Sequence, residues 1–192
     1  MLKKIDAHFT QFTPYLALAS LVIAGHAFSA EKLVAGDKPP VSLGQTRDGE
    51  SIETTQYAGK VLVVTFWASW CGPCKKELPI LEGIQRIGGK DKIQVVAVNI
   101  EDSDQFRKVA KALASLTLTL THDYRKKSSD AYGVNGIPHL VIIGRDGKIV
   151  NVHHGYSEAA LDSIVAEINT ALAACEINAT DTNNKGCNKA GA

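Results

Sequence analysis

"VLVVTFWASWCGPCKKELPIL", residues 61–81, decides the fold because it joins a buried strand to a helix through two cysteines. Its first seven residues are almost entirely apolar and do not alternate, as in a strand covered on both faces. Pro73 suits a first helical turn, where its missing N–H needs no partner, so we expect the helix to begin near Gly72 and Pro73. Residues at helical spacing predict its buried face: Ile80, Leu81, Ile84 and Ile87.

The two cysteines of this stretch predict thiol–disulfide chemistry. Exchange needs a thiolate that attacks and a second thiol that resolves the mixed disulfide. Cys71 lies where unpaired helix N–H groups and the helix dipole favour a thiolate, so we predict Cys71 as the nucleophile and Cys74 as the resolving cysteine. We expect Trp70 to shield the pair on one side.

Two other uses of these cysteines are an inert disulfide and half of a metal site. A metal site needs further ligands at workable spacing, and Cys175 and Cys187 lie twelve residues apart in a polar segment. A c-type haem needs a histidine directly after Cys74, where Lys75 stands. The strand-to-helix junction and the intervening proline therefore favour redox chemistry, and the sequence predicts no metal.

The remaining chain predicts an α/β fold. Two short strands flank a turn at Asp48-Gly49. Further strands are predicted at 93–100, 116–121 and 139–143, and the last of these forms a hairpin with 149–154. Helices are expected after Asp102 or Ser103, over 126–132 and after Ser157. Strands that alternate with helices imply a mostly parallel sheet with helices on both faces, ending in an antiparallel hairpin.

The N-terminal residues 1–29 have the order of a secretory signal peptide. Lys3 and Lys4 precede an apolar run over 14–25, and small residues follow. The alternative is an uncleaved signal anchor, although the apolar run is short for a membrane span. Both predict export into a compartment where disulfides persist.

After the signal peptide we expect one domain over 30–174 and a polar tail over 175–192. Cys175 and Cys187 either form a structural disulfide, which we favour, or act as a mobile second dithiol. The net charge is +1, and no basic cluster is interleaved with aromatic residues, so nucleic-acid binding is not predicted.

"FWASWCGPCKKELPIL" together with "YGVNGIPHLVII" resembles the thioredoxin superfamily, and the flanking residues resemble its exported TlpA/ResA-like branch. The resemblance covers about Gly36 to Ala173. It implies a thioredoxin fold, with a central mixed sheet flanked by helices, an N-terminal strand extension and a central insertion. It also implies a thiol:disulfide oxidoreductase that needs no cofactor. Pro138 would be cis and lie beside the sulfurs, which would leave the Ile137 backbone free to pair with a substrate peptide.

Two positions depart from the family pattern and bear on tuning of the dithiol. Thr65 stands where thioredoxin has a buried aspartate that relays a proton. Glu77 is the nearest acidic residue; it would assist, but we expect it on the exposed helix face. His139 replaces the usual threonine and either favours the thiolate when protonated or is a partly buried strand residue. Gly72 and Pro73 match the pair found in thioredoxin itself.

The function expected from these observations is a periplasmic reductase of disulfides in exported proteins, including apocytochrome c. By family analogy its electron donor is a membrane thiol reductase of the DsbD/CcdA type. One alternative is an oxidant of the same fold, which needs a more stabilised thiolate. Another is a binding or chaperone-like domain without turnover.

Overall fold

The computed structural model describes residues 32–179. The expected signal peptide at 1–29 and Cys187 lie outside the described residues. The helices and strands follow in the order β1 (Ser42–Gln45), β2 (Ser51–Glu53), η1 (Thr54–Tyr57), β3 (Val61–Trp67), α1 (Gly72–Gly88), β4 (Ile93–Asn99), α2 (Ser103–Ala112), β5 (Thr119–His122), η2 (Tyr124–Lys126), α3 (Lys127–Ala131), β6 (His139–Ile143), β7 (Ile149–His154) and α4 (Glu158–Ala179).

All seven strands form one sheet in the order β2-β1-β5-β4-β3-β6-β7. β3 pairs parallel with β4, and β4 with β5, whereas the other neighbouring strands are antiparallel. The expectation of a mostly parallel sheet is therefore wrong. The reason is that the N-terminal hairpin joins β5, and β6 joins β3, in the antiparallel sense. The predicted antiparallel hairpin of β6 and β7 is confirmed. The mixed sheet with an N-terminal strand extension is confirmed.

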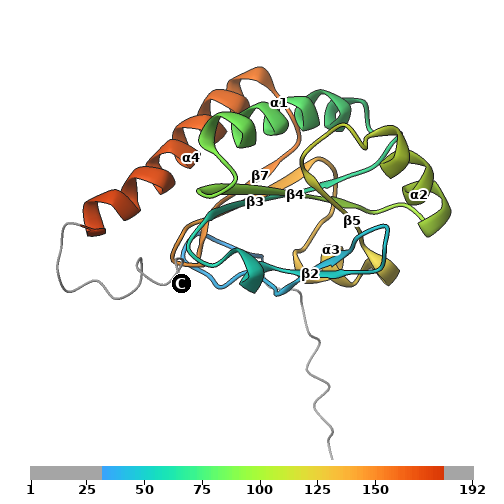
Figure 1. The fold of residues 1–192 in the computed structure, drawn as a ribbon, viewed down its shortest axis with the longest axis horizontal. Coiled ribbons are helices and arrows are strands. Elements are labelled where there is room, and N and C mark those ends of the chain that lie inside the picture. The colour runs from blue at the N-terminus through green and yellow to red at the C-terminus, as the bar shows by residue number, and fades with distance from the viewer. Residues whose placement is uncertain (1–31, 180–192) are drawn as a thin grey trace, which may run out of the picture.

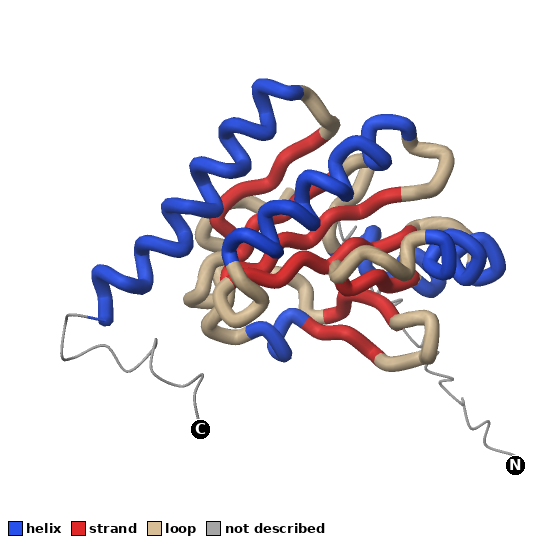
Figure 2. The backbone as a smooth tube through the Cα atoms, turned by 45° about the horizontal axis from the view of Figure 1, so that its top comes forward, coloured by secondary structure: helices blue, strands red, loops and turns tan. Residues whose placement is uncertain are grey.

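Helices cover both faces of the sheet. Figures 1 and 2 show α1 and α4 side by side on one face, while α3 and the N-terminal segment lie on the other. One core cluster joins Cys71, Cys74 and Leu81 to Ile164 and residues of β3, β4 and β6. The opposite cluster is built around Phe66 and Tyr132. The sheet thus divides the interior into two separate apolar layers, and the dithiol belongs to the layer under α1 and α4.

The predicted buried face of α1 is confirmed at Leu81 and in part at Ile84, which packs against the core cluster, but it is wrong at Ile87. The buried residues of this helix are Cys74, Glu77, Leu78, Leu81 and Gln85, while Ile87 is 86% exposed. The cause is that Cys74, fixed at the start of the helix, sets the rotation of all later turns. Two polar residues on this face are hydrogen-bonded, as burial requires. Gln85 Oε1 accepts from Val95 N at 2.7 Å, and its Nε2 donates to the Thr117 carbonyl at 3.1 Å.

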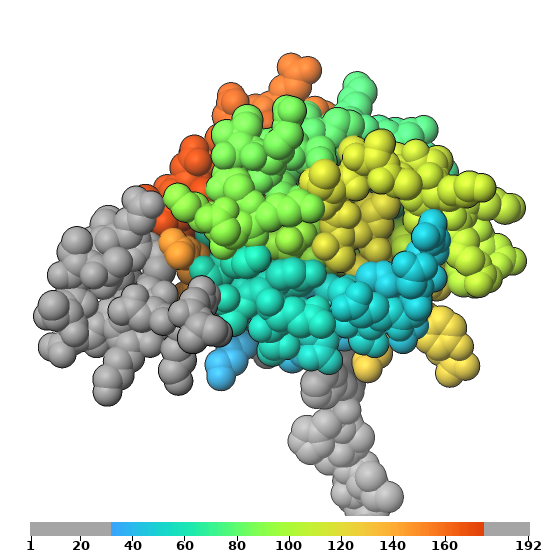
Figure 3. Space-filling view, in the orientation of Figure 1, coloured from blue at the N-terminus to red at the C-terminus, as the bar shows by residue number. Residues whose placement is uncertain are grey.

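The last helix, α4, begins with a hydrogen bond from Ala160 N to Ser157 Oγ, as predicted for a capping serine. It continues to Ala179, so the first residues of the segment expected as a polar tail are helical. Within residues 32–179, none of the helices is both long and apolar enough to span a membrane. Figure 3 shows α1, in green, on the surface between α4 and α2.

Candidate redox site

The two cysteines lie at the junction of β3 and α1, as predicted. Cys71 is the N-cap residue of α1, and its Sγ accepts a hydrogen bond from Cys74 N at 3.1 Å. The structure shows the pair as a disulfide with the Cα atoms 5.3 Å apart. Cys71 is 4% exposed and Cys74 is fully buried. Of the two sulfur-bearing residues, Cys71 is therefore the one nearer to solvent, as an attacking cysteine needs to be.

The loop before Cys71 is held by a carboxylate that the sequence prediction missed. Glu101 Oε2 accepts from Ser69 N at 2.6 Å, and Oε1 accepts from Ser69 Oγ at 2.7 Å. Asn99 Nδ2 donates to the same carboxylate at 3.0 Å. Partial burial opposes ionisation of Glu101, but the hydrogen bonds from Asn99 and Ser69 outweigh it and lower its pKa.

A sequence signal for Glu101 existed. It follows β4, and the carboxyl ends of adjacent parallel strands meet at one edge of the sheet, so β3 and β4 bring Ser69 and Glu101 together. Trp70, the next residue in the held loop, is 69% exposed. A large apolar ring therefore stands beside the disulfide with most of its surface open to a partner.

Glu77 is buried, contrary to the prediction of an exposed helix residue. It is 1% exposed, and its Oε2 accepts a hydrogen bond from Thr65 Oγ1 at 2.7 Å. Burial raises the pKa of this carboxyl, while the Thr65 hydrogen bond and the charge of His153 act in the opposite direction. Glu77 follows Cys74 by three residues, so both side chains lie on the same face of α1. Thioredoxin has a buried carboxylate at the position of Thr65. In this chain Glu77 of α1 supplies a buried carboxylate next to that position.

The Ile137–Pro138 peptide bond is cis, as the family resemblance implies. Pro138 is buried, and its carbonyl accepts a hydrogen bond from Gly155 N at 2.8 Å. Ile137 is partly buried and packs against the core cluster that contains both cysteines. The loop before β6 therefore borders the apolar layer to which the dithiol belongs.

His139 lies on the other face of the sheet from the dithiol. Leu140 belongs to the core cluster of the cysteines, and successive strand residues point to opposite faces. The His139 ring packs edge-on against Phe66 and His154, with ring centroids 5.8 Å and 4.7 Å away. Burial, with a smaller contribution from His154, lowers its pKa to about 4. The hypothesis that protonated His139 favours the thiolate is therefore wrong, because the ring is neutral at neutral pH.

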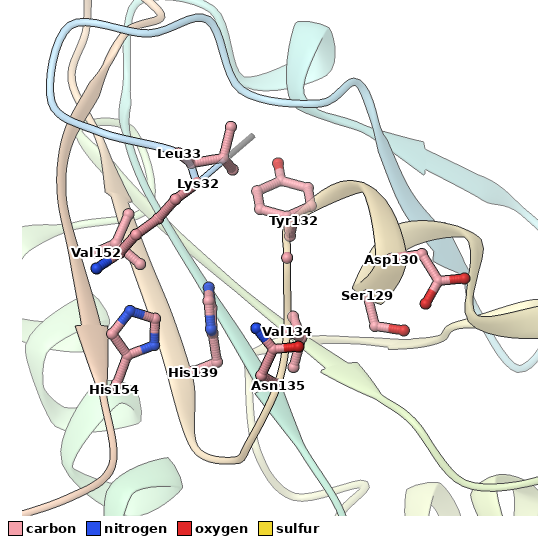
Figure 4. Close-up of a pocket in the computed structure, with 11 residues that line it drawn as sticks. Lys32, Leu33, Ser129, Asp130, Tyr132, Val134, Asn135, His139, Val152 and His154 are labelled. Carbon is pink, nitrogen blue, oxygen red and sulfur yellow. The ribbon is translucent and has the colours of Figure 1, made fainter. Parts of the chain in front are cut away.

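A cavity of about 530 Å³ adjoins His139 on this second face. Figure 4 shows the rings of His139 and His154 on its floor, with Asn135 and Tyr132 beside them. Neither cysteine lines it, so this cavity is not the site of the disulfide chemistry. Both ring nitrogens of His139 are buried without a hydrogen-bond partner.

Among the described residues, no group of three or more histidine, cysteine, aspartate or glutamate side chains has metal-binding geometry. His153 pairs with Glu167 at 2.7 Å. The pairing of Cys175 with Cys187 stays a prediction, because Cys187 lies outside the described residues.

Comparison with known proteins agrees with this geometry. The family model described as Redoxin matches residues 34–172. The thiol-disulfide oxidoreductase ResA of Geobacillus thermodenitrificans is 29% identical over 142 residues, which are 73% of this chain and 81% of that protein. The thioredoxin-like protein YneN of Bacillus subtilis is 32% identical over 123 residues, covering 62% of this chain and 71% of YneN.

Solved structures show the same fold. One from Chlorobium tepidum has a TM-score of 0.65 and 31% identity, covering 73% of this chain and 99% of that one. StoA of Bacillus subtilis has a TM-score of 0.54 and 27% identity, covering 67% and 96%. The thioredoxin fold expected from the sequence is confirmed. The chain belongs to the Redoxin family and is a ResA-like thiol:disulfide oxidoreductase of the thioredoxin superfamily.

Proposed function

We propose that the chain reduces disulfides in exported proteins in the periplasm. The observation that carries this proposal is the placement of Glu77, a buried carboxylate, one turn after the resolving cysteine. In the reduced protein, the Cys71 thiolate attacks a substrate disulfide and forms a mixed disulfide. The Cys74 thiol then loses its proton, attacks Cys71 Sγ and releases the reduced substrate.

Glu77 is proposed as the base for the second step. Cys74 is fully buried, so bulk water does not reach its thiol directly. Burial raises the pKa of Glu77 above its ordinary value, which makes it a stronger base than an exposed glutamate. Thr65 Oγ1 holds one carboxylate oxygen at 2.7 Å. Thr65, which stands at the position of the thioredoxin aspartate, therefore orients Glu77, the carboxylate proposed to act in its place.

The docking edge is proposed to consist of Trp70, Ile137 and Pro138. Trp70 offers an exposed ring, and Ile137 precedes the cis peptide bond next to the core cluster of the cysteines. Gly72 and Pro73 leave space at the helix start. Gly72 has no heavy atom within 4 Å of a Cβ built upon it, so the helix start is open at this position.

The cellular setting rests on the sequence. The predicted signal peptide at 1–29 supports export, and an uncleaved anchor is the alternative. Turnover as a reductase needs electrons, for which a membrane thiol reductase of the DsbD/CcdA type is the proposed donor. Apocytochrome c is one proposed substrate. Cys175 and Cys187 are proposed to form a structural disulfide.

Trapping of substrates tests the proposal. In a Cys74→Ser variant the mixed disulfide on Cys71 cannot be resolved, so exported proteins should accumulate as covalent adducts that reductant releases. A Cys71→Ser variant is the matched control and should trap none. If the Cys74→Ser variant also trapped none, the binding or chaperone-like function without turnover would be favoured.

The direction of electron flow is tested by a redox titration of the Cys71–Cys74 pair. A reductase should have a potential near that of thioredoxin, about −270 mV. A value near that of DsbA, about −120 mV, would contradict the reductase proposal and favour the oxidant.

A further inference from the structure

His153 lies on the same face of the sheet as the dithiol, in one cross-strand row with Thr65. Thr65 in β3 pairs with Leu140 in β6, and Leu140 pairs with His153 in β7. Directly paired residues point to the same face, and here that face is covered by α1 and α4. Two strand spacings separate the backbones of Thr65 and His153, roughly 10 Å. The Glu77 side chain extends from α1 to this row and accepts the hydrogen bond from Thr65.

The imidazole of His153 is held in a defined orientation. Its Nε2 lies 2.7 Å from Glu167 Oε2 on α4. Burial opposes ionisation of Glu167, but the hydrogen bonds from His153, Asn151 and Ser163 outweigh it and lower its pKa. An ionised carboxylate only accepts hydrogen bonds, so Nε2 must carry the proton. Nδ1 is then the nitrogen that can gain and lose a proton.

The row connects a buried group, Glu77, to a partly exposed group, His153. Glu77 is 1% exposed, whereas the side chains of His153 and Glu167 are 14% and 23% exposed. A proton taken up by Glu77 therefore needs a carrier to leave the interior. Both groups belong to the row beneath α1 and α4: Glu77 accepts a hydrogen bond from Thr65, and strand pairing places His153 two strands from Thr65.

The ionisable groups that face this row are few among the described residues. Glu77 and the two cysteines belong to α1, and Glu167 belongs to α4. β3 and β6 contribute Thr65 and Leu140 to this row, and neither side chain ionises near neutral pH. His154, the next residue on β7, points to the other face, where it packs against His139.

We propose that His153, oriented by Glu167, is a positioning residue that carries the proton from Glu77 to solvent during resolution of the mixed disulfide. This proposal rests on the base role proposed for Glu77. The Cys74 thiol gives its proton to the Glu77 carboxylate, and the new thiolate attacks Cys71 Sγ. The Cys71–Cys74 bond forms as the bond to the substrate sulfur breaks, and the substrate leaves as a thiolate with the electron pair. Glu77 then passes the proton to His153 Nδ1, directly or through one water, and the imidazolium releases it to solvent.

The two thiol steps can be separated with the aromatic disulfide DTNB. Reduced protein releases a first coloured thiolate when Cys71 attacks, and a second when Cys74 resolves the mixed disulfide. In a His153→Gln variant we expect the second phase to slow about tenfold near neutral pH, while the first phase changes less than about twofold. Added imidazole buffer should restore much of the second phase, because it replaces the lost proton carrier.

Two further variants serve as comparisons. His154→Gln changes the adjacent histidine on the other face and should leave both phases unchanged. Glu167→Gln should slow the second phase less than His153→Gln does, because the imidazole remains but loses its charged partner. A second phase in His153→Gln that matches the unaltered protein, or one that imidazole does not accelerate, would overturn the relay.

The same measurement separates this inference from the proposed function. If the reduced protein released no thiolate from DTNB, the thiol chemistry itself would fail. If Glu77→Gln left the second phase unchanged, the base role of Glu77 would fail. If Glu77→Gln slowed that phase and His153→Gln did not, the relay alone would be rejected.

Discussion

The two faces of the sheet each bury a titratable side chain close to the dithiol motif, and they treat it differently. Glu77, under α1 and α4, accepts a hydrogen bond from Thr65 and lies on the face of the cysteines. His139, on the face opposite the cysteines, has two ring nitrogens without a partner and packs between aromatic rings. Both are about 1% exposed, so burial alone does not distinguish them.

The difference lies in what each neighbourhood provides for a charge. A hydroxyl donor and a nearby imidazole partly compensate the burial of the Glu77 carboxylate, as the proton exchange with Cys74 that we propose requires. The surroundings of His139 offer no compensation, and this ring stays neutral down to a pH of about 4. A buried ionisable residue beside a reactive motif is therefore a candidate for chemistry only where partners for its charge are present.

The largest expected difference between the two faces is kinetic. We expect Glu77→Gln to slow the resolving step about 100-fold, the usual size of a lost general base. His139→Leu should change this step less than about twofold, since its ring lies across the sheet. The two-phase DTNB reaction measures both. Lys76→Gln, an exposed neighbour of Glu77, is the control for general effects on the helix. Similar slowing by Glu77→Gln and His139→Leu would erase the distinction drawn between the faces.

The next effect concerns stability in acid. Unfolded His139 gains its proton near its ordinary pKa of 6.5, whereas the folded residue gains it only at about 4. Between these values the unfolded state binds more protons, so the free energy of unfolding falls as the pH falls. His139→Leu should remove about 2 kcal/mol of the loss between neutral pH and about pH 4.5. Urea unfolding of both proteins at the two pH values measures it. Parallel pH profiles would show that His139 does not contribute.

The smallest effect is the stability cost of the Glu77 charge. Because the folded pKa of Glu77 is raised, the unfolded carboxyl ionises first as the pH rises past 4.5, and the folded state loses stability. Glu77→Gln keeps an acceptor for Thr65 and removes the charge. We expect the variant to be more stable, relative to the parent, at neutral pH than below the ordinary carboxyl pKa of 4.5, and urea unfolding of both proteins at the two pH values measures this. A variant less stable than the parent at high pH would indicate that the charge itself is stabilising.

The sequence was sufficient where local chemistry decides the structure. Pro73 and the buried run before Cys71 predicted the strand-to-helix junction, and the family resemblance implied the cis bond before Pro138. These features depend on a few neighbouring residues. Sheet direction was harder to predict, because the pairing of β1 with β5 joins residues nearly eighty positions apart.

The errors concern which way a side chain faces. Lys75, Lys76 and Glu77 look like a solvated turn, so Glu77 was expected to be exposed, and Ile87 was wrongly included in the buried face of α1. The spacing from Cys74 to Glu77, Leu78 and Leu81 follows the true buried face. His139 was misplaced for a similar reason, since closeness to Pro138 in sequence does not decide the face of a strand. Glu101 was missed because its contacts with Ser69 depend on how β3 and β4 align.

The hydrogen bonds from Ser69 to Glu101 have a consequence for how partners are recognised. Two hydrogen bonds of 2.6 and 2.7 Å fix the residue before Trp70, and Gln105 Nε2 adds a third to the Ser69 hydroxyl at 3.1 Å. The backbone beneath the exposed indole is therefore ordered before any partner arrives, and docking need not lose much conformational entropy there. We expect a rigid platform of this kind to accept different client sequences through one aromatic surface, with selectivity supplied by the client's own accessible disulfide.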